Sequence, residues 1–169
     1  MKKVIVIGNC GAGKSRFAAA LGNKLHLPVV HLDKLYWKKG WVRTSKEDWE
    51  KIQHELVQKR EWIIDGNYQS TLDLRLKAAD TILFLDFPKW LCLYRAMKRR
   101  IINRRKPRPD IPQELHERIT FGFVKWILTY PRKDVYMQIE KLQGNQQVLV
   151  LHNPKELAHF LSDCATWRV

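Results

Sequence analysis

The chain has 169 residues, a length typical of one domain, and a formal net charge of +14. Hydrophobic residues make up 45% and charged residues 28%, which excludes a disordered chain. The three cysteines, Cys10, Cys92 and Cys164, stand far apart without a CxxC pair, so neither a disulfide framework nor a zinc site is supported. The N-terminus lacks a signal-peptide core and no apolar run has transmembrane length, so we expect a cytoplasmic protein without a membrane partner.

Short apolar runs alternate with amphipathic segments along the chain. The apolar runs predict five buried strands, at 4–7, 29–32, 62–64, 81–85 and 148–151. Helices are predicted between them, at 14–27, 45–56, 71–77, 88–101, 115–126 and 131–142, and a last helix opens at 153–154. Residues 34–44 form a polar and aromatic connection, and the proline-rich stretch 107–112 forms a loop. This alternation predicts an α/β fold, a parallel sheet between two layers of helices, in one domain over 1–169.

A glycine-rich motif follows the first predicted strand. The eight residues fit G-x-x-x-x-G-K-[ST] at every fixed position: Gly8, Asn9, Cys10, Gly11, Ala12, Gly13, Lys14 and Ser15. Such a loop points successive backbone N–H groups into one cavity, and the following helix adds partial positive charge. We therefore predict a P-loop that holds ATP, with Arg16 beside it. Lys14 would reach the β- and γ-phosphates, and the Ser15 hydroxyl would ligate Mg²⁺.

Three aspartates follow predicted strands, at the edge where open α/β sheets bind ligands. Asp65 is the candidate for holding magnesium-bound water, although a turn aspartate before Gly66 is the alternative. Asp33 is a candidate base for the acceptor hydroxyl, and a solvated strand-end carboxylate is nearly as plausible. Asp86 precedes Phe87-Pro88, and we interpret it as a helix cap rather than a catalytic group.

Much of the positive charge is local. Residues 89–108 hold nine basic residues and no acid, which leaves +5 on the other 149 residues. Arg95 and Arg99 share one helical face, and we predict that they belong to a phosphoryl-transfer lid, since arginine binds phosphate oxygens bidentately. Trp90, Tyr94, Met97 and Ile101 fall on one stripe of the same helix. A solvated basic face or a nucleic-acid patch remains the alternative for this segment.

Aromatic residues cluster in and after the second connection. Tyr36, Trp37, Trp41 and Trp49 could stack on a planar or sugar-like substrate, and the favoured interpretation is the small core of a substrate-binding region. The histidines show no metal spacing, so we expect surface or structurally satisfied side chains at all six: His26, His31, His54, His116, His152 and His159.

Several segments together resemble the adenylate-kinase-related P-loop kinases, and most closely the DNA topology modulation (FlaR-like) proteins. The resemblance spans nearly the whole chain and rests on the P-loop and on the stretches at 31–37, 62–68, 72–76 and 84–91. It implies a five-stranded parallel sheet of order 2-3-1-4-5, a substrate-binding insertion near 35–60 and a lid near 103–113. Asp65-Gly66 matches the Asp-Gly whose aspartate holds magnesium-bound water in adenylate kinases. Arg95 to Arg100 resembles the arginines that open the lid, and Asn153-Pro154 matches the segment that contacts adenine.

The sequence departs from adenylate kinases after Asp65-Gly66. Asn67-Tyr68 replaces Phe-Pro, and the arginine that grips a monophosphate has no obvious counterpart. The acceptor is therefore open between a nucleotide-like molecule and a hydroxylated metabolite resembling shikimate or gluconate. We predict an ATP- and Mg²⁺-dependent kinase for a small molecule. The alternatives are an ATP-binding regulator of DNA topology that contacts nucleic acid through 89–108, and an NTPase without transfer activity.

Overall fold

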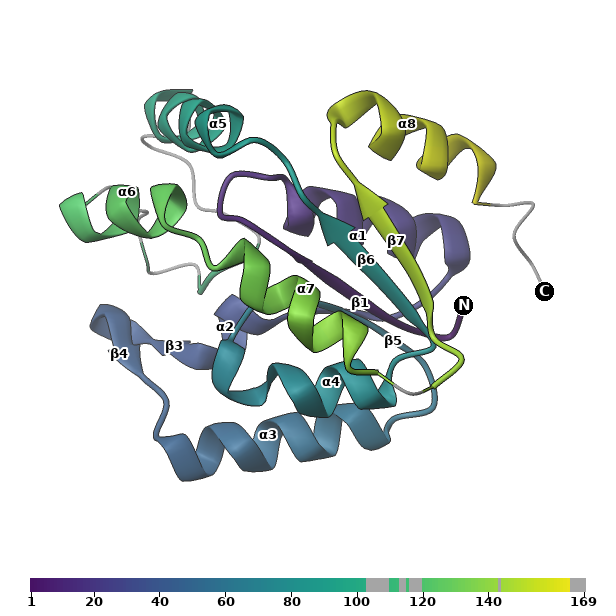
Figure 1. The fold of residues 1–169 in the computed structure, drawn as a ribbon. Helices are drawn as coiled ribbons and strands as arrows, with labels where there is room; N and C mark the ends of the chain where they lie inside the picture. The colour runs from purple at the N-terminus through teal and green to yellow at the C-terminus, as the bar shows by residue number, and fades with distance from the viewer. Residues whose placement is uncertain (103–109, 113–114, 116–119, 143, 165–169) are drawn as a thin grey trace.

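A computed structural model describes residues 1–102, 110–112, 115, 120–142 and 144–164. Five parallel strands form the central sheet: β1 (Lys3–Gly8), β2 (Val29–His31), β5 (Trp62–Asp65), β6 (Thr81–Leu85) and β7 (Gln147–Leu151). Their order is β2-β5-β1-β6-β7. Numbered among these five strands alone, this is 2-3-1-4-5, so the predicted fold class and strand order are confirmed. All carboxyl ends of the strands lie at one edge, which also carries the glycine-rich loop (Figure 1).

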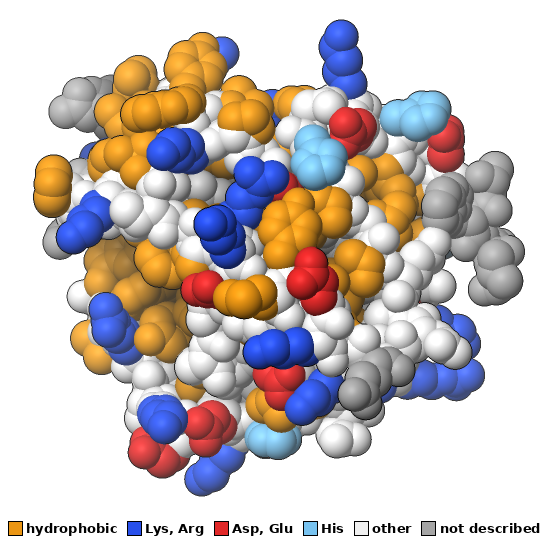
Figure 2. Space-filling view, in the orientation of Figure 1, with side chains coloured by type: hydrophobic (Ala, Val, Ile, Leu, Met, Phe, Trp, Pro, Cys, Tyr) orange, Lys and Arg blue, Asp and Glu red, His pale blue; other side chains and the backbone are white. Residues whose placement is uncertain are grey.

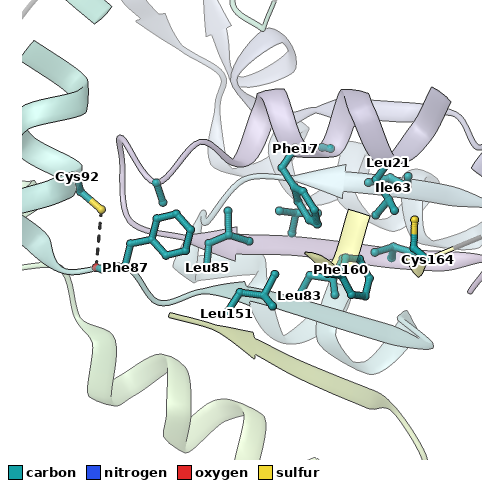
Figure 3. Close-up of a cluster of buried hydrophobic side chains, with 14 of the residues drawn as sticks. Phe17, Leu21, Ile63, Leu83, Leu85, Phe87, Cys92, Leu151, Phe160 and Cys164 are labelled. Carbon is teal, nitrogen blue, oxygen red and sulfur yellow. Dashed lines mark hydrogen bonds between the residues drawn. The ribbon is translucent and has the colours of Figure 1, made fainter. Parts of the chain in front are cut away.

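Helices cover both faces of the sheet. One face carries α1 (Lys14–Leu25), α5 (Lys89–Ile102) and α8 (Pro154–Asp163), which pack against Val4 and Val6 of β1. In Figure 3, Leu21 of α1 lies beside Ile63 of β5, and Phe160 of α8 lies beside Leu83 of β6. The other face carries α3 (Lys46–Gln58), α4 (Leu72–Ala78) and α7 (Arg132–Glu140), which pack against Ile5 and Ile7. Alternate residues of β1 thus serve the two layers, as a fully buried strand requires.

The chain between β2 and α3 differs from its prediction. Leu32 was expected to end a strand, but it begins α2 (Leu32–Tyr36) and is fully buried. The predicted irregular connection contains a small antiparallel hairpin, β3 (Trp37–Lys38) and β4 (Val42–Arg43), joined by the turn η1 (Lys39–Trp41). The physical reason is that the Leu32 side chain packs in the core beside Gly66, and the chain begins a helix at this residue.

The chain after α5 also contains α6 (Phe121–Leu128), and a short turn, η2 (Gln69–Thr71), precedes α4. Thr120 caps α6 by accepting a hydrogen bond from the backbone N–H of Phe123, so the helix predicted over 115–126 starts later. Of the predicted lid at 103–113, residues 103–109 and 113 lie outside the described residues. The lid therefore stays a prediction.

Candidate active site

The loop between β1 and α1 has the backbone geometry of a phosphate cradle. Gly11 and Gly13 have φ angles of 87° and 97°, a left-handed conformation that residues with a Cβ rarely adopt. A Cβ at Gly11 would also lie 2.1 Å from the carbonyl oxygen of Cys92, so α5 packs directly against this loop. Helix α1 begins at Lys14, immediately after the loop, and its first N–H groups have no partner within the helix. This arrangement is suited to binding an anion.

Two asparagine side chains anchor the loop, one from the loop itself and one from the segment after β5. Asn9 is buried, and its side-chain amide donates to the carbonyl oxygen of Ile127 in α6 at 2.8 Å. The Gly8 N–H donates to Oδ1 of Asn67 at 3.1 Å. Lys14 curls over the loop, with Nζ 3.1 Å from the carbonyl oxygen of Asn9. The predicted P-loop residues are thus brought together, with the lysine ammonium at the cradle.

Asp65 ends β5 and lies beside Val6 of β1, two residues before the P-loop begins. Its carboxylate is buried, and Oδ2 lies 2.9 Å from Nδ1 of His31 at the end of β2. The sequence suggested no role for His31 beyond a satisfied side chain. The pairing follows from strand order, because β2 and β5 are neighbours and align His31 with Asp65.

Asp33 lies in the first turn of α2 rather than at the end of a strand. Its Oδ1 accepts a hydrogen bond from the Tyr68 hydroxyl at 2.6 Å. Burial, followed by the charge of Asp33, raises the pKa of Tyr68 well above its ordinary value, so the phenol remains a donor. Tyr68 itself has a φ of 36°, an uncommon conformation for a bulky residue. The structure therefore holds the candidate base in a fixed position through a residue that the sequence did not identify.

Arg75 explains how Tyr68 is held. The side chain is fully buried, and its guanidinium donates to the backbone carbonyls of Gly66 at 2.7 Å, Asn67 at 2.6 Å and Tyr68 at 3.0 Å. Burial lowers the pKa of Arg75 to about 9, which leaves the side chain charged at neutral pH. A buried guanidinium so occupied serves to fix the 66–68 loop and cannot reach a bound acceptor.

The two arginines predicted to act in catalysis both lie near the P-loop. Nη1 of Arg95 lies 3.5 Å from the carbonyl oxygen of Ala12, and the guanidinium lies over the ring of Phe87. Arg99 follows one turn later on α5 and is close enough to influence the thiol of Cys10. Their charges therefore reach the loop from α5.

The pKa of the Cys10 thiol depends on several side chains near the loop. Burial raises the pKa of its thiol, and the nearby ammonium of Lys14 partly offsets that rise. Asp33 raises the pKa further, whereas Arg99 and a hydrogen bond with the Trp126 side chain lower it. The thiol is thus protonated at neutral pH, and Lys14, Asp33, Arg99 and Trp126 all influence its pKa.

Asp86 has a different role from the predicted helix cap. Its buried carboxylate accepts hydrogen bonds from Arg132 and from the Tyr136 hydroxyl, the latter at 2.7 Å. His152 Nδ1 lies 3.5 Å from the same oxygen. Arg132 and Tyr136 belong to α7, and His152 follows β7. These contacts therefore attach α7 and the end of β7 to the end of β6.

Asn153 caps α8, and Pro154 is the first residue of that helix. The Asn153 side chain accepts hydrogen bonds from the backbone N–H groups of Lys155 and Glu156, both at 3.0 Å. The side-chain oxygen of Asn153 is thus used in capping the helix. Contact of Asn153 and Pro154 with adenine stays a prediction.

Three solved structures match over nearly the whole chain. Shikimate kinase from Acinetobacter baumannii, in complex with shikimate, is 18% identical with a TM-score of 0.57 over 100% of this chain and 96% of that one. A gluconokinase from Sinorhizobium meliloti 1021 is 14% identical with a TM-score of 0.54 over 98% and 94%. Deoxyadenosine kinase from M. mycoides, with bound dCTP, is 13% identical with a TM-score of 0.52 over 96% and 98%. The chain has the fold of these P-loop kinases. No family model matches it, and no curated protein matches it in sequence.

The P-loop kinase fold is also compatible with the metal chemistry of the candidate site. Among the described residues, no three His, Cys, Asp or Glu side chains gather as a possible metal site. Mg²⁺ characteristically binds through one or two protein oxygens together with water and substrate phosphates, and does not need such a cage. Ser15 at the start of α1 and Asp65 at the end of β5 supply oxygens of this kind.

No helix in the described ranges has the length and apolar character needed to span a bilayer.

Proposed function

We propose that the protein is an ATP-dependent kinase that transfers the γ-phosphate to a hydroxyl group of a small molecule. The observation that carries this proposal is the glycine-rich loop, with its left-handed glycines and Lys14 lying over it. The protein would act as one domain over 1–169. The cysteines Cys92 and Cys164 are free and buried, which is consistent with a reducing compartment such as the cytoplasm.

The loop and its neighbours would bind the nucleotide. Backbone N–H groups of the glycine-rich loop and of the start of α1 would hold the β- and γ-phosphates, and Lys14 would neutralise their charge. Ser15 and Asp65 would hold Mg²⁺, Asp65 through water, and the metal would supply charge stabilisation to the phosphates. His31 would keep the Asp65 carboxylate oriented, since it already contacts one of its oxygens. Arg16 and Asn153-Pro154 would border the rest of the nucleotide.

Transfer needs a base and compensation of charge. The acceptor hydroxyl oxygen would attack the γ-phosphorus while the bond to the β-phosphate oxygen breaks, and Asp33 would take the hydroxyl proton. Arg95 and Arg99 would stabilise the charge that develops on the phosphoryl oxygens. The influence of Asp33 on the pKa of Cys10 supports this assignment, because it indicates that the charge of this carboxylate acts on the loop. A lid at 103–113 would then exclude water.

The matched kinases are named for shikimate, gluconate and deoxyadenosine, so the fold is compatible with different kinds of small acceptor. We also propose membership of the DNA topology modulation (FlaR-like) group, on the sequence resemblance described above. Neither inference identifies the acceptor by itself.

The decisive experiment is a screen of ATP consumption with Mg²⁺ against nucleosides, nucleotides, sugars and hydroxy acids. We expect ADP formation that depends on one acceptor class and that Lys14→Ala abolishes. Equal ADP formation with and without every acceptor would support an NTPase instead, and no ADP formation at all would contradict the proposal.

One observation favours a second function, binding of nucleic acid through α5. The stripe containing Trp90, Tyr94 and Ile101 is exposed, at 64%, 61% and 73%, rather than packed in the core. Lys89 and Lys98 lie over the rings of Trp90 and Tyr94. Figure 2 shows hydrophobic side chains with basic ones among them over this part of the molecule. Exposed rings beside cations are the usual platform for single-stranded nucleic acid.

This second function makes a separate prediction. Binding of single-stranded DNA should weaken with salt, with a log–log slope of about −0.7 for each phosphate contacted. Trp90→Ala and Lys98→Ala together should weaken binding without altering ATP turnover. Absence of binding at low salt would remove this function and leave the kinase proposal intact.

A further inference from the structure

The loop of residues 66–68, between β5 and η2, is held in place by hydrogen bonds of its backbone. The Gly66 N–H donates to the carbonyl oxygen of Val6 in β1 at 3.2 Å. The buried guanidinium of Arg75 donates to all three carbonyls of the loop. Gly66 and Tyr68 both have positive φ angles, 143° and 36°, a backbone shape that persists where surrounding contacts hold it. The side chains of the loop therefore leave it at fixed positions.

The Asn67 side chain joins the 66–68 loop to the phosphate loop. Its Oδ1 accepts a hydrogen bond at 3.1 Å from the N–H of Gly8, the first residue of the P-loop, and lies 3.4 Å from the Tyr130 hydroxyl. Gly8 itself packs closely on β6, because a Cβ there would lie 2.5 Å from the carbonyl oxygen of Leu85. The Asn67 amide is thus bonded to a backbone position that the sheet fixes.

The next residue, Tyr68, joins the same loop to the candidate base. Its hydroxyl donates to Oδ1 of Asp33 at 2.6 Å. The Tyr68 ring packs against Tyr36 and Trp49, with centroids 4.6 Å and 4.7 Å away, which fixes the direction of the hydroxyl. Two consecutive side chains of one loop therefore contact the first residue of the phosphate loop and the carboxylate proposed to act on the acceptor.

We propose that Asn67 is a positioning residue for phosphoryl transfer. Through its bond to the Gly8 N–H it sets the 66–68 loop, and with it Tyr68 and Asp33, at a defined distance from the bound triphosphate. This inference rests on the proposed kinase function and adds to it a residue that acts through others, without itself touching the reacting atoms.

The physical reason is the geometry that transfer requires. The acceptor oxygen must lie about 3–3.5 Å from the γ-phosphorus before the new bond forms, the bond to the β-phosphate oxygen breaks and Asp33 takes the hydroxyl proton. A displacement of about 1 Å can cost about 10²-fold in rate. Loss of the Asn67 oxygen leaves the P-loop and Asp33 in the chain but loosens their relative position. It therefore affects kcat more than the affinity for ATP.

The experiment measures kcat and KM with Mg-ATP for wild type and variants of Asn67. The acceptor used throughout is the nucleoside, nucleotide, sugar or hydroxy acid that gives the fastest ADP formation with wild type. Asn67→Ala and Asn67→Leu remove the acceptor oxygen, the second with little change in size. We expect both to lower kcat about 10- to 100-fold, with KM for ATP within about two-fold of wild type.

A conservative variant separates position from charge. Asn67→Asp keeps an oxygen that can accept the hydrogen bond from Gly8, so it should recover most of kcat. Its negative charge beside the phosphates should raise KM for ATP. A kcat for Asn67→Asp as low as that of Asn67→Leu would contradict a role for the hydrogen bond.

Gln69→Ala is the matched control. Gln69 directly follows the 66–68 loop, but its Oε1 accepts a hydrogen bond from Gln138 of α7, at 3.2 Å. The substitution removes an amide hydrogen bond of the same kind and should leave kcat unchanged. The rise in Tm with Mg-ATP should persist in every variant, which shows that each is folded and still binds the nucleotide.

A double-variant cycle tests whether Asn67 acts through Tyr68. Tyr68→Phe keeps the ring, removes the bond to Asp33 and should itself lower kcat. Once that bond is lost, the position of the loop matters less to Asp33. The variant that combines Tyr68→Phe with Asn67→Leu should therefore have a kcat within about three-fold of the lower single variant, rather than a loss equal to the product of the two.

The outcomes separate this inference from the kinase proposal. An unchanged kcat in Asn67→Ala and Asn67→Leu, an equal loss in Gln69→Ala, or multiplying losses in the double variant would overturn the positioning role and leave the kinase function standing. If only one of the two oxygen-removing variants folds, that variant decides. Failure of wild type to form ADP with any acceptor would contradict the kinase function itself, and this inference with it.

Discussion

The two ends of the candidate active site are built in different ways. The phosphate end is a loop of consecutive residues between one strand and one helix, and its backbone N–H groups are proposed to do the binding. The acceptor end is built from side chains of distant segments, with Asp33 held by Tyr68 and Tyr68 held by Arg75. The first end is therefore determined by local backbone geometry. The second depends on tertiary contacts, so its specificity can change while the phosphate end remains the same.

The largest effect should come from the charge of Asp33, which joins the two ends. Asp33→Asn keeps an oxygen that can accept the hydrogen bond from Tyr68 but removes the base. We expect kcat to fall by about 10²–10⁴, with the affinity for Mg-ATP unchanged, in a steady-state assay with the preferred acceptor. An unchanged kcat would show that another group takes the proton.

The next effect concerns the support of the acceptor end. Arg75→Met removes the guanidinium and leaves three carbonyls of the 66–68 loop without their donor, which should cost about 3 kcal/mol or more in the free energy of unfolding. Calorimetry should record a fall in Tm of roughly 6 °C or more. Arg43→Met, which removes an exposed arginine, should alter the Tm little. Equal Tm values for both variants would contradict the structural role of Arg75.

The phosphate end offers a matched pair of glycines. Gly11→Ala and Gly13→Ala both place a Cβ at positive φ, which costs about 1–2 kcal/mol. Only at Gly11 would the Cβ meet backbone atoms, those of Cys92, whereas nothing lies within 4 Å at Gly13. We expect Gly11→Ala to lower the free energy of unfolding by roughly a further 1–3 kcal/mol in urea titrations. The same stability for both would mean that α5 does not pack on the loop as described.

The smallest effect is a pH dependence at the acceptor end. The pKa of Tyr68 is raised in the folded chain, so the phenol stabilises the fold below its unfolded pKa of about 10, and this contribution is lost as pH rises above that value. Tyr68→Phe should therefore lose stability less steeply than wild type between about pH 9 and 11.5 in urea titrations. Tyr94→Phe, which removes an exposed phenol, should keep the wild-type slope. Parallel profiles for Tyr68→Phe and wild type would contradict the buried Asp33–Tyr68 bond.

The sequence was most informative for site residues that a short motif or the end of one strand identifies. The P-loop residues and Asp65 were predicted because a motif fixes the former and the end of an apolar strand fixes the latter. The five-stranded order followed from the resemblance. For the P-loop and for Asp65, residues close together in the sequence carry the signal.

Contacts between distant segments could not be predicted in this way. The pairing of His31 with Asp65 requires β2 to lie beside β5, and the burial of Arg75 requires the 66–68 loop to close over it. The stripe on α5 faces outward because the small residues Cys92 and Ala96, both fully buried, let the helix approach the P-loop. An amphipathic pattern does not say whether large or small side chains will face the core.

The most direct test of the account is the stabilisation of the chain by Mg-ATP. At a ligand concentration of about 100 times Kd, binding should add about 2.7 kcal/mol, or roughly 5–10 °C in Tm. We predict this shift for wild type and for Lys51→Ala, which removes an exposed lysine of α3, and its loss in Lys14→Ala. No shift in wild type, or an equal shift in all three proteins, would contradict the claim that the loop after β1 holds the triphosphate.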